Sequence, residues 1–248
     1  MTLILTEISE FGIAMAADSA VTETVNLNTG EERHRVLTGV RKLQPIHHLQ
    51  AGISCWGLGE IQRVPTDIWL ENFIRQNSNI NTLNGFALSL QEELRRIVGR
   101  IRQNSLGFHL AGFVEVDGRR LPTFYHIHNG PSQYPNINAT IDPALFNANQ
   151  DFPPEVCPLG FFKMTRNGDY QLYAELFHVV EEFFNSRVRP LGIEIPHPLN
   201  LNSIAEYLRF QIKTVSEIYK LSNLVPGIGG PVTTLTISEQ GITSYETK

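Results

Sequence analysis

The first residues of the chain could supply a nucleophile together with its proton acceptor. Thr2 directly follows Met1, and Asp18 closes an alternating apolar segment that comes shortly afterwards. Once Met1 is removed, Thr2 carries a hydroxyl nucleophile and a free α-amine, and the amine can accept the hydroxyl proton. Threonine is small enough for an aminopeptidase to remove the methionine before it. We therefore expect an active site at the start of the chain.

A lysine and a glycine further along could supply the other groups that such a nucleophile needs. Lys42 lies in a predicted strand among apolar neighbours, where its charge requires an acidic partner such as Asp18. Gly57 closes another predicted strand, and its backbone N–H could donate to the oxyanion of a tetrahedral intermediate. The α-amine has a reference pKa of about 7.7–8 and lysine one of about 10.4, so the amine is the better proton acceptor at neutral pH. Lys42 then stays charged and lowers the pKa of the Thr2 hydroxyl.

Apolar periodicity predicts the elements that must position these residues. Alternating apolar residues are typical of strands, and recurrence every three to four residues is typical of helices. Predicted strands cover residues 3–8, 12–18, 40–43, 51–57, 108–116, 122–127, 232–238 and 242–245. Predicted helices cover residues 64–75, 82–103, 170–187 and 202–221, the second with Thr82 as its cap. The first two strands form a hairpin, which would return Asp18 to the neighbourhood of Thr2.

The order of these elements predicts an α+β fold. Two pairs of helices separate three groups of strands, so helices must cover each outer face of two stacked sheets. A four-layer α/β/β/α sandwich is the economical arrangement. We expect a single domain over residues 1–248, with a charged loop at 26–35 and proline-containing loop excursions at about 131–158 and 189–200.

Composition excludes several functional classes. A net charge of −5 without a long basic run gives no electrostatic footprint for nucleic acid. Two cysteines are too few for a disulfide framework or a metal cluster, which favours a reducing compartment. No apolar run approaches the roughly 20 residues of a membrane span, and the first residues lack the bases of a secretory signal. We expect a cytoplasmic protein with no cofactor, which binds neither nucleic acid nor membrane.

Two segments resemble a known family. TLILTEISEFGIAMAADSAVT, residues 2–22, is similar to the opening of proteasome β-type subunits and their bacterial relatives in the N-terminal nucleophile (Ntn) hydrolase superfamily. RKLQPIHHLQAGISCWGLGE, residues 41–60, is similar to the lysine-containing strand and glycine turn of that family. The resemblance assigns the catalytic roles to Thr2, Asp18, Lys42 and Gly57.

The same resemblance implies further site residues. Three of them would pair with an extended peptide substrate, namely Val21, Thr22 and Gly59. Cys55 falls at the floor of the side-chain pocket. Asn167 or Asp169 stands where the family has a serine that tunes the terminal amine, so this part of the site departs from the family pattern.

The resemblance implies a proteasome-like threonine endopeptidase that hydrolyses peptide bonds through an acyl-enzyme on Thr2. Its substrates would be peptides or unfolded proteins, its subunits would form a homo-oligomeric ring or stack, and an unfoldase or adaptor could feed it. Two alternatives remain open. One is an Ntn amidase that acts on a small amide, and the other is a non-catalytic, proteasome-like assembly subunit.

Simpler interpretations exist for several residues. Asp18 could be a turn acid at a strand end, and the stem of Lys42 could lie along surface apolar groups. Cys55 could be a nucleophile, but a buried small hydrophobic residue is the favoured interpretation. His126 and His128 share a strand face and could bind a metal, yet no third ligand has recognisable spacing.

Overall fold

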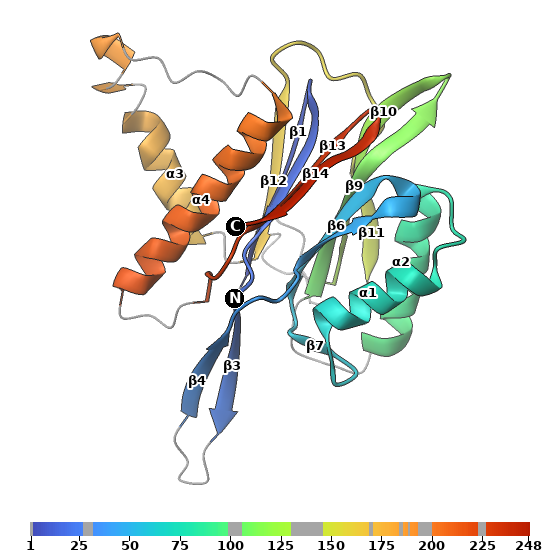
Figure 1. Cartoon of the computed structure of the whole chain (residues 1–248), viewed down its shortest axis with the longest axis horizontal. Coiled ribbons are helices and arrows are strands. Elements are labelled where there is room, and N and C mark those ends of the chain that lie inside the picture. The colour runs from blue at the N-terminus through green and yellow to red at the C-terminus, as the bar shows by residue number, and fades with distance from the viewer. Residues whose placement is uncertain are drawn as a thin grey trace, which may run out of the picture.

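Two five-stranded antiparallel sheets pack face to face, and a pair of helices covers each outer face (Figure 1). This confirms the predicted α/β/β/α sandwich. The computed structural model describes residues 2–26, 32–98, 106–129, 146–168, 171–183, 186–187, 189–192, 200–222 and 227–248. None of the helices in these ranges is long and apolar enough to cross a membrane.

The first sheet contains both ends of the described chain and has the strand order β12-β1-β2-β13-β14. Its strands are β1 (Leu3–Ser9), β2 (Gly12–Ala17), β12 (Phe162–Gly168), β13 (Thr233–Ser238) and β14 (Gly241–Thr247). Every residue of β1 and β2 is buried, because helices cover one face of this sheet and the second sheet covers the other. The predicted hairpin is confirmed, with Ile4 opposite Ala17.

The second sheet has the order β11-β10-β9-β6-β5. Its strands are β5 (Leu43–Ile46), β6 (Ala51–Gly57), β9 (Leu106–Val116), β10 (Arg119–His128) and β11 (Asn147–Phe152). The 3-10 helix His47–Leu49 joins β5 to β6, and the short strands β7 (Glu60–Ile61) and β8 (Val64–Pro65) follow β6. Another 3-10 helix, Arg189–Leu191, lies between the last two described α-helices of the chain.

The four predicted helices are confirmed, with different ends. They are α1 (Thr66–Gln76), α2 (Leu83–Val98), α3 (Gln171–Phe183) and α4 (Leu201–Leu221). Thr82 caps α2 as predicted, since its Oγ1 accepts the Gly85 N–H at 3.1 Å. Helices α1 and α2 bury their apolar stripe on the second sheet, and α3 and α4 cover the first. Each fully buried Leu or Ile side chain in these layers stabilises the fold by roughly 1.5–3 kcal/mol.

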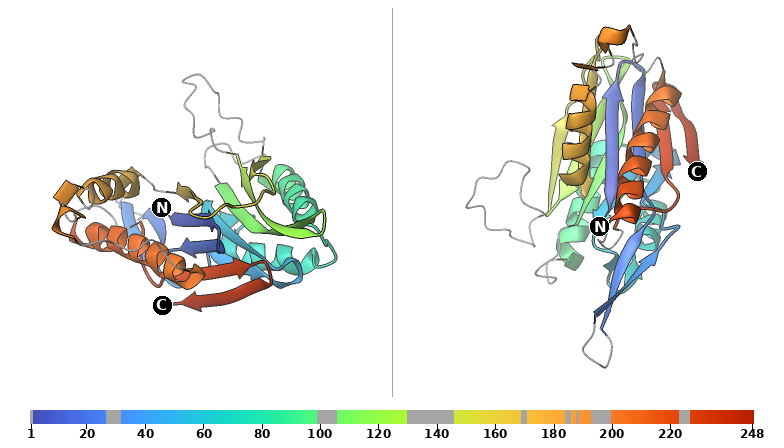
Figure 2. Two further views of the ribbon diagram at one scale, coloured as in Figure 1. Left: turned by 90° about the horizontal axis from the view of Figure 1, so that it is seen from above. Right: turned by 90° about the vertical axis from the view of Figure 1, so that its left-hand side faces the viewer.

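Among the described residues, six strands were not predicted, namely β3, β4, β11, β12 and the two short strands β7 and β8. Residues 26 and 32–35 of the predicted loop belong instead to a two-stranded ribbon, β3 (Val21–Asn26) and β4 (Glu32–Leu37), which projects from the sandwich (Figures 1 and 2), and residues 27–31 lie outside the described ranges. Neither strand sequence, VTETVN nor ERHRVL, has the alternating apolar residues that predict a strand. The edge strands β11 and β12 were also missed, since nearly all of their residues are exposed or only half-buried and present no buried alternating face.

These strands shorten the predicted loops. Strand β11 occupies part of the excursion at 131–158, of which residues 131–145 lie outside the described ranges. The predicted strand at 40–43 is also wrong in extent, because β5 begins at Leu43 and Lys42 lies in the connection before it.

Candidate active site

Antiparallel pairing of β1 and β2 brings Thr2 and Asp18 to the same end of the first sheet. The Leu3 N–H donates to Asp18 Oδ1 at 3.0 Å, and the Asp18 N–H donates to the Leu3 carbonyl at 3.3 Å. The carboxylate therefore lies against the peptide group that follows Thr2. Both side chains are buried, with Thr2 only 5% and Asp18 only 1% exposed.

Lys42 forms a buried ion pair with this carboxylate. Its Nζ lies 2.9 Å from Asp18 Oδ1 and also donates to the Ala20 carbonyl. Lys42 is 3% exposed. Removing two charges from water costs several kcal/mol per ion, so such a pair persists only where geometry and further hydrogen bonds compensate.

Backbone N–H groups provide those further hydrogen bonds. The Ala20 and Gly229 N–H groups each donate to Asp18 Oδ2 at 3.1 Å. Gly229 comes from the connection that precedes β13, far along the chain from Asp18. Sequence reasoning missed this contact because a backbone donor carries no residue-type signal.

Gly57 ends β6 with φ = 98°, a left-handed conformation that favours glycine. Strand β6 is tied to the lysine segment, since the Cys55 N–H donates to the Lys42 carbonyl at 2.8 Å. The turn after Gly57 is held by the first residue of α1. Thr66 Oγ1 donates to the Leu58 carbonyl at 2.7 Å, and the Thr66 N–H donates to the Gly59 carbonyl at 2.9 Å.

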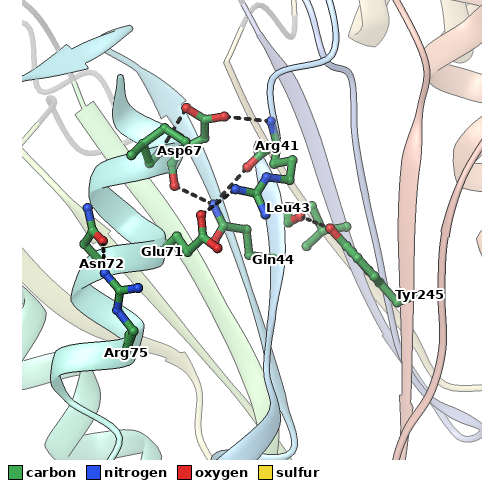
Figure 3. A network of polar contacts seen from close by, with 9 residues as sticks. Arg41, Leu43, Gln44, Asp67, Glu71, Asn72, Arg75 and Tyr245 are labelled. Atoms are coloured by element: carbon green, nitrogen blue, oxygen red, sulfur yellow. Dashed lines mark hydrogen bonds and ion pairs between the residues drawn. The ribbon is translucent and has the colours of Figure 1, made fainter. Parts of the chain in front are cut away.

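The next residue of α1 holds the backbone beside Lys42 (Figure 3). Asp67 Oδ2 accepts the Arg41 N–H at 3.2 Å. The Gln44 side-chain amide donates to the Asp67 carbonyl at 2.8 Å and to the Arg41 carbonyl at 3.1 Å. The start of α1 therefore clamps both the lysine segment and the glycine turn.

A contact from the last strand completes this clamp. The Tyr245 hydroxyl of β14 donates to the Leu43 carbonyl at 3.0 Å, and burial raises the pKa of Tyr245 (Figure 3). Sequence reasoning missed Asp67 and Tyr245. An acid in the first turn of a helix is expected from the helix dipole alone, so its sequence signal does not distinguish a clamp.

Strand β12 approaches Thr2 on the other side of β1. Gly168 pairs with Leu3 and has φ = 97°, and a Cβ at this position would lie 1.8 Å from the Thr2 carbonyl oxygen. Only glycine fits there. Asn167 is buried, and its Oδ1 lies 2.6 Å from His109 Nε2. A tuning role of Asn167 toward the terminal amine stays a prediction, and Asp169 lies outside the described residues.

Of the predicted substrate-binding residues, Val21 and Gly59 lie close together, and Thr22 follows Val21. Val21 and Thr22 begin β3 and are half-buried. A Cβ at Gly59 would lie 3.4 Å from Val21 Cγ1, so these two segments face each other. Cys55 instead belongs to the apolar cluster beneath α1 and α2, and burial raises the pKa of its thiol to about 12. A thiol of this kind is a poor nucleophile, which disfavours the cysteine alternative.

The histidines that suggested a metal lie between the sheets. The rings of His126 and His128 stack with centroids 4.2 Å apart. Within the described residues, no group of three or more His, Cys, Asp or Glu side chains is arranged to hold a metal ion.

Comparisons with known proteins bear on the fold. No family model matches the chain, and no curated protein matches it. A solved structure of a mutant of Anbu from Hyphomicrobium sp. strain MC1 superposes with a TM-score of 0.52 at 12% identity, covering 100% of this chain and 87% of that one. At this identity the likeness shows the fold alone. The chain thus has the α+β fold of the Anbu structure, two antiparallel sheets flanked by helices.

Proposed function

We propose that this protein is a proteasome-like threonine peptidase that cleaves peptide bonds through an acyl-enzyme on Thr2 after removal of Met1. The buried Lys42–Asp18 pair is the observation that carries the proposal. The pair lies beside the peptide group that follows Thr2. Burial of a lysine and an acid costs desolvation free energy, which a well-packed apolar core would not require. The positive charge of Lys42 would lower the pKa of the nearby Thr2 hydroxyl, which accounts for a buried ion pair at this position.

In the proposed reaction, Thr2 supplies the nucleophile and the proton acceptor, and Gly57 supplies the oxyanion donor. Thr2 Oγ attacks the substrate carbonyl while its α-amine takes the hydroxyl proton. The Gly57 N–H donates to the resulting oxyanion. The proton on the α-amine passes to the leaving amine as the scissile C–N bond breaks, which leaves an ester on Thr2 Oγ. Water, deprotonated by the same amine, then hydrolyses the ester.

The substrate would lie extended between the start of β3 and the glycine turn. Val21 faces Gly59. Lys42 hydrogen-bonds to the Ala20 carbonyl directly before Val21 and to the Cys55 N–H of β6, which supports binding of an extended peptide backbone between the two segments. We further propose homo-oligomeric assembly into a ring or stack, served by an unfoldase or adaptor. Exposed aromatic residues on α4 support a subunit contact, since Phe210 is 56% exposed and stacks with Tyr207.

N-terminal mass and active-site labelling test the proposal. Intact-mass spectrometry should show loss of Met1, and a retained methionine would refute the mechanism because it blocks the amine. A β-lactone or epoxyketone should label Thr2, and Thr2→Ala should abolish labelling. Thr214→Ala is the matched control, because Thr214 is a half-buried residue of α4 whose hydroxyl donates to the Phe210 carbonyl of its own helix.

Substrate assays separate the alternatives. Hydrolysis of fluorogenic peptides without hydrolysis of small amides supports the peptidase, and the reverse supports the amidase. A particle of ring size by light scattering that neither reacts with the β-lactone nor cleaves either substrate would identify a non-catalytic assembly subunit.

A further inference from the structure

One histidine links the two sheets directly behind the candidate active site. His109 lies on β9 with its side chain between the sheets and is 0% exposed. Its Nδ1 lies 2.9 Å from Thr6 Oγ1 on β1, and its Nε2 lies 2.6 Å from Asn167 Oδ1 on β12. The ring therefore connects the second sheet to two neighbouring strands of the first.

The partners determine the tautomer of this ring. The carboxamide oxygen of Asn167 only accepts hydrogen bonds, so His109 Nε2 carries the proton. Nδ1 is then an acceptor, and the Thr6 hydroxyl donates to it. Burial, with the nearby His126 and His128, holds the pKa of His109 well below its usual range, which agrees with a neutral ring. Both ring nitrogens are satisfied only in this form.

The hydrogen bond from His109 holds Asn167, the direct neighbour of the residue that contacts Thr2. Asn167 directly precedes Gly168, whose backbone packs so closely on the Thr2 carbonyl that a Cβ there would lie 1.8 Å from the oxygen. Asn167 is also paired with Ile4 in the β1–β12 ladder. The position of the end of β12 is therefore transmitted to Thr2 by direct contact.

We propose that His109 is a positioning residue, which holds the end of β12 against Thr2 through the hydrogen bond from its Nε2 to Asn167. The inference rests on the proposed function, because it assigns a role in orienting the nucleophile. His109 touches no reacting atom. The bond to Thr6 orients the ring, and the bond to Asn167 carries the effect.

Two substitutions of His109 test its two hydrogen bonds separately. In His109→Gln the side-chain amide can reach the position of Nε2 and still donate to Asn167. In His109→Asn the shorter amide reaches only the position of Nδ1 and keeps the bond to Thr6. His126→Gln is the control, since His126 lies in the same cluster, 5.3 Å from His109 between ring centroids, and its Nδ1 faces Asp151 on β11 instead of the first sheet.

Peptidase kinetics give distinct expectations. We expect His109→Asn to lower kcat by about 10- to 100-fold with KM changed less than about twofold, because a small misplacement of a reacting group costs this much. His109→Gln should keep kcat within about threefold of the wild type, as should His126→Gln. Equal loss in His109→Asn and His109→Gln, or no loss in either, would overturn the proposal.

Hydrogen–deuterium exchange tests the positioning role of His109 independently of the proposed peptidase function. Exchange of residues 2–9 and 162–168, measured without substrate, should rise in His109→Asn and remain near the wild type in His109→Gln. If the wild type is neither labelled at Thr2 nor active, the peptidase function fails, and exchange alone then decides whether His109 orders Thr2. Unchanged exchange in His109→Asn would refute the positioning role.

Discussion

Glu7 allows a quantitative test of how burial acts on a carboxyl group in the first sheet. It lies in the middle of β1, opposite Ala14 of β2 and Met164 of β12, and is 5% exposed. Burial raises the pKa of Glu7 from 4.5 to about 7. Tyr173 of α3 lies near it, on the helical side of the sheet, and burial raises the pKa of that hydroxyl as well.

The raised pKa sets the sign of the pH dependence. Between pH 4.5 and about 7 the folded protein holds a proton on Glu7 that the unfolded chain has released. The free energy of unfolding therefore falls as pH rises through this window. At about 1.36 kcal/mol per unit, the loss at pH 8 relative to pH 4.5 amounts to about 3 kcal/mol from this group. Glu7→Gln keeps the shape of the protonated side chain and cannot ionise.

Urea denaturation at pH 5, 6, 7 and 8 and at one protein concentration measures the effect. Glu7→Gln should be more stable than the wild type by up to about 3 kcal/mol at pH 8, and the difference should shrink toward pH 5. Glu175→Gln, on the exposed side of α3, is the control for the loss of one carboxylate outside the buried sheet. A difference between Glu7→Gln and wild type that is constant with pH would refute the reasoning.

Three further substitutions test the site. Lys42→Met leaves a buried carboxylate unpaired, so urea denaturation should show a loss of about 3–5 kcal/mol, and β-lactone labelling should disappear. Gly168→Ala places a Cβ 1.8 Å from a backbone oxygen and should abolish labelling and lower the Tm strongly, whereas Gly118→Ala meets nothing within 4 Å and should cost only about 1–2 kcal/mol for its left-handed φ. Asp67→Asn should lower kcat by about tenfold in the peptide assay by loosening the Arg41 backbone. Glu71→Gln, which removes an exposed ion pair with the Arg41 side chain, should change kcat by less than about twofold.

Each of these has a contrary outcome. Full labelling of Lys42→Met would exclude its role in activating Thr2. Equal Tm values for the two glycine variants would mean that β12 moves freely away from Thr2. Equal kcat values for Asp67→Asn and Glu71→Gln would show that the start of α1 does not orient the lysine segment.

The sequence by itself determined the features that depend on neighbours along the chain. A hairpin returns its end to its beginning, so the predicted strands 3–8 and 12–18 sufficed to place Asp18 near Thr2. The helices are visible because one face of each is buried and the apolar period follows from that. Strands whose sequences lack a sustained alternation of apolar residues, such as β3, β4 and β12, show no such pattern and were missed.

Only the tertiary structure decided which distant groups complete the site. The Gly229 N–H reaches Asp18, Asp67 reaches the Arg41 backbone, and Tyr245 reaches the Leu43 carbonyl because sheets and helices pack in one particular way. In the sequence, His109 is one polar residue in an apolar strand, and its neighbours along the chain do not predict Thr6 or Asn167 as its partners. Local periodicity determines which face of an element is buried, whereas the packing of two sheets determines what each buried polar atom meets.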